Sequence, residues 1–132
     1  MIAGLLTLAI IGAIYQAIAT QLDGQAYHAP GKLVDVGTHS LHINCIGQGS
    51  PTVILESGLG TMSADWANVQ PEVAKTTRVC SYDRAGTGWS ERVPTPRDPK
   101  QIARELHTLL ANTGIDGPYV LVGQSFGGLW TP

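Results

Sequence analysis

The chain has 132 residues, of which 8 are Lys or Arg and 10 are Asp or Glu, so its formal net charge at pH 7 is -2 with histidine neutral. This balance excludes a protein that binds nucleic acid by neutralising a row of phosphates. Because 43% of the residues are hydrophobic and 14% are charged, the chain is not intrinsically disordered, and its length allows at most one globular domain.

The amino-terminal segment, residues 1–22, has no charged side chain. Residues 1–19 are apolar, and as a helix they span about the hydrocarbon thickness of a bilayer, which predicts a transmembrane anchor. The alternatives are a buried core helix and a cleaved signal peptide. Ala17 and Ala19 give the small-x-small form of a signal peptidase site, but no Lys or Arg precedes the apolar run. A short uncharged leader leaves the domain outside the cytoplasm, secreted if the leader is cleaved.

Residues 23–31 are polar and contain Gly and Pro, which predicts a linker between membrane and domain. Two runs follow, 32–36 and 39–46, separated by a Gly-containing break. In the second run apolar and polar residues alternate, which predicts a β-hairpin. We expect His39 and His42, which lie in this hairpin, to be surface or edge residues.

Beyond the hairpin, strands alternate with helical segments. Continuous apolar runs predict buried strands at residues 52–56, 77–82 and 118–123. A short helical stretch is expected around residues 66–73, and the Gly and Pro content of residues 83–97 predicts an irregular loop. This order predicts an α/β fold with a mostly parallel sheet and flanking helices.

The clearest helix covers residues 98–113. Asp98 is its expected cap, Gln101 completes an Asp-x-x-Gln capping box, and Pro99 suits the first helical position. Gly114 ends the helix in the left-handed conformation. Its apolar face comprises Ile102, Leu106, Leu109 and Leu110.

A sharp catalytic signal is the sequence Gly-Gln-Ser-Phe-Gly at residues 123–127, a G-x-S-x-G nucleophile elbow directly after a predicted strand. The two glycines leave room where side chains would collide with backbone. The turn exposes the Ser125 hydroxyl at the carboxyl edge of the sheet, with the first amides of the next helix behind it. The pattern predicts Ser125 as nucleophile; the alternative is a Gly-rich turn that merely exposes a serine.

Two more loops follow predicted parallel strands and reach the same edge, where open α/β sheets bind ligands. Residues 57–60, Ser-Gly-Leu-Gly, can turn a backbone N–H toward the nucleophile or form an ordinary strand-end turn. In the second loop, we expect Asp83 and Arg84 to organise the loop without doing chemistry. A phosphate site is not indicated, because the G-x-G of this loop lacks the rest of the pattern.

With these motifs, residues 31–132 resemble the α/β-hydrolases, specifically the bacterial group with an apolar amino-terminal segment. The resemblance is carried by residues 55–60, Trp66, 79–90, 107–114 and 118–128. It implies Ser125 as nucleophile, the N–H groups of Leu59 and Phe126 as oxyanion-hole donors, and a small-molecule acyl substrate with no cofactor or metal. Gly58, Gln124 and Trp66 are substrate-pocket candidates.

The chain departs from the family pattern in two ways. Gln124 stands where members of this group often have His. The family order is Ser, then acid, then His, but the seven residues after Ser125 contain none of these partners. We therefore expect residues 32–132 to be the amino-terminal part of a longer hydrolase domain, inactive alone, with the strand at 118–123 left as an apolar edge.

The expected function is a membrane-anchored serine hydrolase that acts on an ester or related acyl bond through an acyl-enzyme. Alternatives are other chemistry on the same scaffold, such as a peptidase, carbon–carbon hydrolase or perhydrolase, and a non-catalytic membrane-tethered binding protein. Epoxide hydrolase and dehalogenase relatives carry Asp at the position of Ser125. In the implied fold the strands of Cys45 and Cys80 are neighbours; two buried thiols are favoured over a disulfide.

Overall fold

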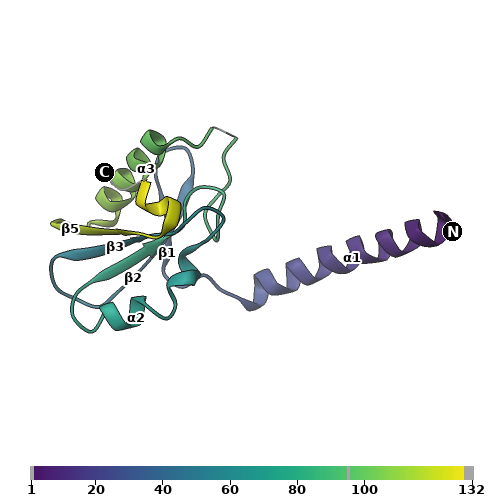
Figure 1. The fold of residues 1–132 in the computed structure, drawn as a ribbon, viewed down its shortest axis with the longest axis horizontal. Coiled ribbons are helices and arrows are strands. Elements are labelled where there is room, and N and C mark those ends of the chain that lie inside the picture. The colour runs from purple at the N-terminus through teal and green to yellow at the C-terminus, as the bar shows by residue number, and fades with distance from the viewer. Residues whose placement is uncertain (1, 95, 130–132) are drawn as a thin grey trace.

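The computed structural model describes residues 2–94 and 96–129, which form a long helix followed by a small α/β domain (Figure 1). The helices and strands are α1 (Ile2–Ala26), β1 (Lys32–Asp35), β2 (Ser40–Ile46), β3 (Thr52–Glu56), α2 (Gln70–Val73), β4 (Val79–Tyr82), α3 (Pro99–Thr113) and β5 (Tyr119–Gly123). Two 3-10 helices, η1 (Ser63–Trp66) and η2 (Ser125–Leu129), complete the described elements.

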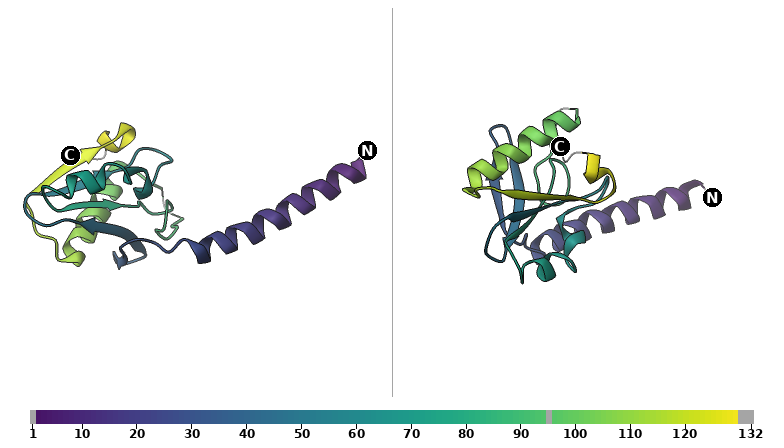
Figure 2. Two further views of the ribbon diagram at one scale, coloured as in Figure 1. Left: turned by 90° about the horizontal axis from the view of Figure 1, so that it is seen from below. Right: turned by 60° about the vertical axis from the view of Figure 1, so that its left-hand side comes forward.

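Helix α1 projects away from the domain as a single rod (Figures 1 and 2). Its segment Gly4–Gly24 is long and apolar enough to cross a membrane, and no part of it is buried against the domain. The helix continues through residues 23–26, which we had expected in the linker, because no proline interrupts the chain before Pro30. The non-helical connection is therefore residues 27–31, while Met1 lies outside the described residues.

The sheet has five strands in the order β1-β2-β4-β3-β5. The pairs β1–β2 and β2–β4 are antiparallel, whereas β3 pairs with β4 and β5 in parallel, so the sheet is mixed. In the register of the last pair, Glu56 lies opposite Gly123. The loops that leave β3 and β5 therefore begin side by side at one edge, as the sequence predicted.

Helix α3 covers one face of the sheet and α2 the other (Figure 2). The α3 side holds the main apolar core, to which the predicted face of α3 contributes. Asp98 accepts a hydrogen bond from the Gln101 amide at 2.8 Å, and Gly114 is left-handed with φ 68°. The Gln101 side chain, which we expected to close a capping box, instead donates to Glu105 at 3.0 Å. Buried members of this core are Leu41, Ile43, Ile54, Cys80, Tyr82, Ala85, Leu106, Leu109, Leu110 and Ile115.

The burial of the predicted strands follows their place in the sheet. Strands β3 and β4 are almost fully buried, as their apolar runs predict. Strand β5 is mostly exposed, because it lies at the end of the sheet with a partner on one side only. The predictions of a strand at residues 118–123 and of its place at the sheet edge are therefore correct. The prediction that this strand is buried is wrong.

Cys45 and Cys80 form a disulfide, so the prediction of two free thiols is wrong. The two residues lie directly opposite each other on the antiparallel strands β2 and β4, with Cα atoms 4.0 Å apart. This register brings the two sulfur atoms together. Because the bridge closes a loop with a sequence separation of 35 residues, the chain-entropy model gives it about 4 kcal/mol of stabilisation.

Candidate functional site

Ser125 lies at the turn between β5 and η2, at the carboxyl edge of the sheet. It is exposed, and its backbone has φ 54°, the left-handed region that non-glycine residues seldom adopt. Its side chain forms no hydrogen bond to another residue within 2–94 and 96–129. The structure therefore holds an accessible hydroxyl on a strained strand-to-helix turn, the geometry that the G-x-S-x-G motif predicts. The helix that the sequence predicts after the strand begins as η2, and residues 130–132 lie outside the described residues.

The two glycines of the motif lie where side chains do not fit. A Cβ on Gly123 would lie 2.4 Å from the Gly128 nitrogen, and a Cβ on Gly127 would lie 2.5 Å from the Glu56 carbonyl oxygen. Backbone atoms cannot move away from such contacts without distorting the turn. The tight turn at Ser125 therefore depends on glycine at both positions.

The loop after β3 lies against this turn. The Gln124 amide donates to the Glu56 carbonyl at 3.0 Å, and a Cβ on Gly58 would lie 3.4 Å from the Cβ of Ser125 and 3.3 Å from the Gln124 carbonyl oxygen. Gly58 and Gln124, two of the predicted pocket residues, are thus brought together next to Ser125. Glycine at position 58 permits this close approach of two loops.

The two predicted oxyanion-hole donors come from different segments of the chain. Leu59 belongs to the loop after β3, and Phe126 is the first residue after the serine in η2. Within the described part of the chain, neither of their N–H groups donates a hydrogen bond to another residue. Both amides are therefore available as hydrogen-bond donors, as an oxyanion hole requires.

Trp66, the third pocket candidate, supports the loop from the side. Its indole N–H donates to the Ser57 hydroxyl at 3.0 Å, and that hydroxyl donates to the Met62 carbonyl at 3.0 Å. Trp66 therefore fixes the conformation of the loop that contains Gly58. A pocket of about 180 Å³ next to this loop is lined by Leu59, Gly60, Arg84, Ala85, Thr87, Arg97 and Ile102, and Trp66 is not among them.

A buried polar cluster lies beneath the loop after β3. Arg84 donates to the Glu56 carboxylate and to the carbonyl oxygens of Ser57 and Gly58, and Tyr82 donates to the other oxygen of Glu56. Burial raises the pKa of Glu56 and outweighs the lowering by Tyr82 and Arg84; burial and Glu56 together hold the pKa of Tyr82 well above its ordinary range. Arg84 thus organises loops, as expected, but the loop it holds most closely is that of residues 57–58.

A second buried cluster joins β2 to the loop after β4. His42 is fully buried, and its Nδ1 lies 2.9 Å from the Asp83 carboxylate while its Nε2 contacts the Pro30 carbonyl. Asp83 also accepts from the amides of Ser63 at 2.6 Å and Trp89 at 3.2 Å. The expectation that His42 is a surface or edge residue is wrong, because β2 is flanked by strands on both sides and covered by the loop after β4.

His39 is buried as well, so the same expectation is wrong for this residue. Its Nδ1 lies 2.9 Å from the Thr38 hydroxyl, and its Nε2 lies 3.6 Å from Glu105 on α3. Glu105 is itself held by Arg97 and Gln101; burial raises its pKa, but these hydrogen bonds outweigh the burial and lower it. His39 therefore packs between the hairpin and α3, away from solvent.

The His42–Asp83 pair makes stability depend on pH. Burial lowers the pKa of His42, but the hydrogen bonds to Asp83 and Pro30 and the charge of Asp83 outweigh it, so the net pKa is raised. For Asp83, burial raises the pKa, but the hydrogen bonds from His42, Ser63 and Trp89 outweigh the burial, so the net pKa is lowered. The stabilisation from charged His42 is complete below about pH 6.5 and is lost as pH rises through its folded pKa.

We therefore expect the free energy of unfolding to fall as pH rises above about 6.5, and the variant His42→Gln to flatten this slope. Urea unfolding in detergent at a series of pH values measures the slope. His107→Gln, at an exposed position on α3, is the matched control and keeps the wild-type slope. An unchanged slope in His42→Gln would contradict the assignment.

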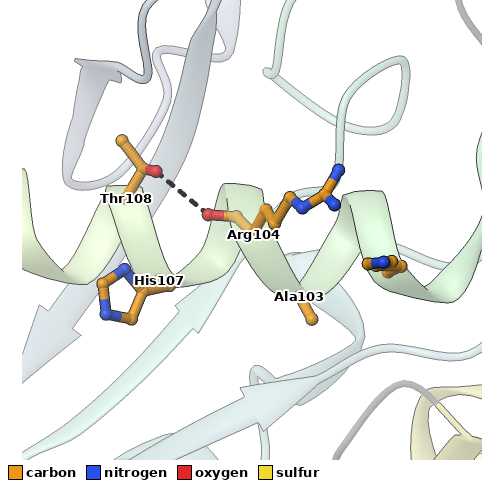
Figure 3. Close-up of a pocket in the computed structure, with 5 residues that line it drawn as sticks. Ala103, Arg104, His107 and Thr108 are labelled. Atoms are coloured by element: carbon orange, nitrogen blue, oxygen red, sulfur yellow. Dashed lines mark hydrogen bonds between the residues drawn. The ribbon is translucent and has the colours of Figure 1, made fainter.

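A wider hollow of about 530 Å³ runs along α3 and is lined by Lys100, Ala103, Arg104, His107 and Thr108 (Figure 3). All of these residues come from one helix, and none belongs to the loops around Ser125. This hollow is therefore not the candidate active site. Within residues 2–94 and 96–129, no group of three or more His, Cys, Asp or Glu residues is arranged to hold a metal ion.

Sequence reasoning missed Glu56 as part of the site. Its position at the end of an apolar strand, one residue before a Gly-rich loop, was the available signal, because a buried carboxylate requires a partner. The partner, Arg84, was already noted in the sequence. Only the parallel pairing of β3 with β4 brings the two together.

Comparison with known proteins agrees with this architecture. The model of the alpha/beta hydrolase fold family matches residues 51–130. The chain is 34% identical over 108 residues to "Probable transporter efuK" of Hormonema carpetanum, covering 77% of this chain and 16% of that protein. Among the curated relatives it matches first, the chain spans 16–26% of their length.

Solved structures give the same result. The enol-lactonase from Burkholderia xenovorans LB400 superposes with a TM-score of 0.70 at 28% identity, covering 75% of this chain and 39% of the lactonase. A serine hydrolase involved in carbazole degradation, the CarC enzyme, superposes with a TM-score of 0.67 at 28% identity and with the same coverage. The family match, the superpositions and the strand order together mean that this chain belongs to the α/β-hydrolase family.

Proposed function

We propose that the protein is a serine hydrolase that cleaves an ester or a related acyl bond, with Ser125 as its nucleophile. The observation that carries the proposal is the conformation at Ser125, an exposed residue at φ 54° that lies next to Gly58. The amides of Leu59, in the same loop as Gly58, and of Phe126, next to the serine in sequence, form no hydrogen bond within the described residues. One similar structure is named an enol-lactonase and the other, CarC, a serine hydrolase, and both names support this class for the chain.

The proposed reaction proceeds in two steps. The Ser125 Oγ forms a bond to the acyl carbon and loses its proton to a base, while the Leu59 and Phe126 amides stabilise the charge on the acyl oxygen. The leaving group departs with a proton, and water then cleaves the acyl–Ser125 bond. No described residue is hydrogen-bonded to the Ser125 hydroxyl as a base, and the triad order of the family puts the acid and His after the serine.

The protein expressed from its complete reading frame tests this proposal. We expect it to hydrolyse p-nitrophenyl acetate and to react covalently with a fluorophosphonate probe, because an activated serine attacks both reagents. A non-catalytic binding protein would do neither. Absence of both reactions in folded protein would therefore refute the proposal. Assays with peptide, carbon–carbon-bond and peroxide substrates then distinguish ester hydrolysis from the other reactions of this scaffold, which are peptide cleavage, carbon–carbon cleavage and perhydrolysis.

We further propose that α1 anchors the protein in a membrane, residues 27–31 connect it to the hydrolase domain, and this domain faces an oxidising, extracytoplasmic compartment. The support is the exposed apolar surface of α1 and the Cys45–Cys80 disulfide, since such bridges persist outside the reducing cytoplasm. If α1 is instead a cleaved signal, the domain is secreted.

The disulfide gives this topology a direct readout. When cells are lysed with a maleimide in denaturing urea, which makes buried thiols accessible, we expect neither cysteine to be modified until a reductant is added, because both are oxidised in the cell. Mass spectrometry of the peptides that contain Cys45 and Cys80 measures the modification. Modification of both thiols before reduction would mean that the domain resides in a reducing compartment.

A further inference from the structure

Arg84 bridges two parts of the site that are distant in sequence. It is the second residue after β4, is 9% exposed, and donates to the carbonyl oxygens of two consecutive residues, Ser57 and Gly58. The Gly58 carbonyl also accepts from the Thr61 hydroxyl at 3.0 Å. Both peptide groups that precede Gly58 and Leu59 are therefore fixed in orientation by the same guanidinium.

This orientation determines where the neighbouring N–H groups point. A trans peptide is planar, so its N–H points away from its C=O. When Arg84 holds the Ser57 and Gly58 carbonyls on its own side, the N–H groups of Gly58 and Leu59 face the opposite side. The turn at Ser125 adjoins this segment, since a Cβ on Gly58 would lie 3.4 Å from the Ser125 Cβ.

Glu56 holds Arg84 in this place. One carboxylate oxygen accepts from Arg84 and the other from the Tyr82 hydroxyl, and Glu56 is 2% exposed. Its main-chain carbonyl accepts from the Gln124 amide, so the residue that fixes Arg84 is also bonded to the serine turn. Glu56, at the end of β3, is therefore bonded both to Arg84, which comes after β4, and to the serine turn, which comes after β5.

We propose that Arg84, held by Glu56, is the positioning residue that orients the Leu59 N–H group, one of the two proposed oxyanion-hole donors, toward the oxyanion formed at Ser125. The inference rests on the proposed serine hydrolase function. A lysine cannot replace the arginine, because its single nitrogen lacks the fixed fork that meets a carboxylate and two carbonyl oxygens together. Without the Arg84 guanidinium, the peptide groups of residues 57–59 can rotate. The oxyanion in the transition state then lacks a hydrogen-bond donor that is held in place in advance.

The test compares Arg84→Lys and Glu56→Gln with the control Glu105→Gln in the protein expressed from its complete reading frame. Glu105 is also buried, at 6% exposed, and is bonded to an arginine, Arg97, but within the described residues none of its hydrogen bonds or ion pairs reaches residues 57–58. We expect Arg84→Lys to lower kcat for p-nitrophenyl acetate by ~10- to 100-fold with KM nearly unchanged, somewhat less than the loss of a whole oxyanion-hole donor. Glu56→Gln lowers kcat in the same direction, whereas Glu105→Gln lowers only the urea midpoint.

The outcomes distinguish failure of the proposed serine hydrolase function from failure of the positioning role of Arg84. If the wild-type protein neither hydrolyses the ester nor reacts with a fluorophosphonate, the proposed function fails first. If the wild type is active and Arg84→Lys keeps its kcat while losing stability as Glu105→Gln does, Arg84 has only a structural role and the inference is wrong. If a single variant does not fold, the double variant Arg84→Met/Glu56→Leu, which removes both buried charges, takes its place. A wild-type kcat in this double variant would also overturn the inference.

Discussion

Ser125→Ala is expected to lower kcat/KM for p-nitrophenyl acetate by ~1,000-fold or more, because removal of a nucleophilic serine leaves only binding and oxyanion stabilisation. Steady-state hydrolysis by the protein expressed from its complete reading frame measures the effect. Ser50→Ala, at another exposed serine, is the matched control and keeps wild-type activity. Equal activity of Ser125→Ala and Ser50→Ala would exclude Ser125 as nucleophile.

Two substitutions of Ser125 test whether the backbone at this position is strained, independently of catalysis. At φ 54°, Ser125 stores backbone strain that glycine does not have. We expect Ser125→Gly to be more stable than Ser125→Ala by about 1 kcal/mol, measured as the free energy of unfolding in urea, although both variants are inactive. A Gly variant no more stable than the Ala variant would mean that the turn is not strained.

Gly127→Ala is expected to destabilise the protein by about 3 kcal/mol, since overpacking against backbone lies at the upper end of the usual range. The added Cβ would lie 2.5 Å from the Glu56 carbonyl oxygen and 2.9 Å from that of Ser57. Gly128→Ala is the matched control, because its Cβ would meet its nearest atom, the Gly123 carbonyl oxygen, at 3.8 Å, an ordinary van der Waals contact. Urea unfolding compares the two variants with the wild type.

The close contact between Gly127 and the loop after β3 also makes activity depend on this glycine. A displaced turn moves Ser125 relative to Gly58, so Gly127→Ala is expected to lose activity even where it remains folded. Comparable unfolding free energies for Gly127→Ala and Gly128→Ala would contradict the packing of η2 against the loop after β3. The two glycines differ by one position in sequence, so differences in helix propensity alone cannot produce the expected gap.

The parts of the fold that the sequence predicted correctly are those with local signals. Helix α3 carries its own cap at Asp98, an apolar face and a terminal glycine, and all three features occur in the structure. The turn at Ser125 is likewise encoded within five residues, 123–127. The sequence could therefore place the candidate nucleophile at the carboxyl edge of the sheet from local pattern alone.

The features that were missed depend on strand order. In β1-β2-β4-β3-β5, β4 lies between β2 and β3, which puts Cys80 opposite Cys45 and Asp83 beside His42. The same order puts Arg84 beneath the loop after β3. A short alternating pattern such as that of β2 does not reveal whether its polar face meets water or a buried carboxylate, which is why His42 was expected at the surface.

The most direct test of the account is to identify the residue that becomes acylated. The protein expressed from its complete reading frame is mixed with p-nitrophenyl acetate, quenched in acid during turnover, digested, and analysed by tandem mass spectrometry. The account predicts one acetyl group on the peptide that contains Ser125, at the serine, and no such adduct in Ser125→Ala. Turnover with the acetyl group on another residue, or with no covalent adduct in a quench fast enough to capture it, would contradict the account.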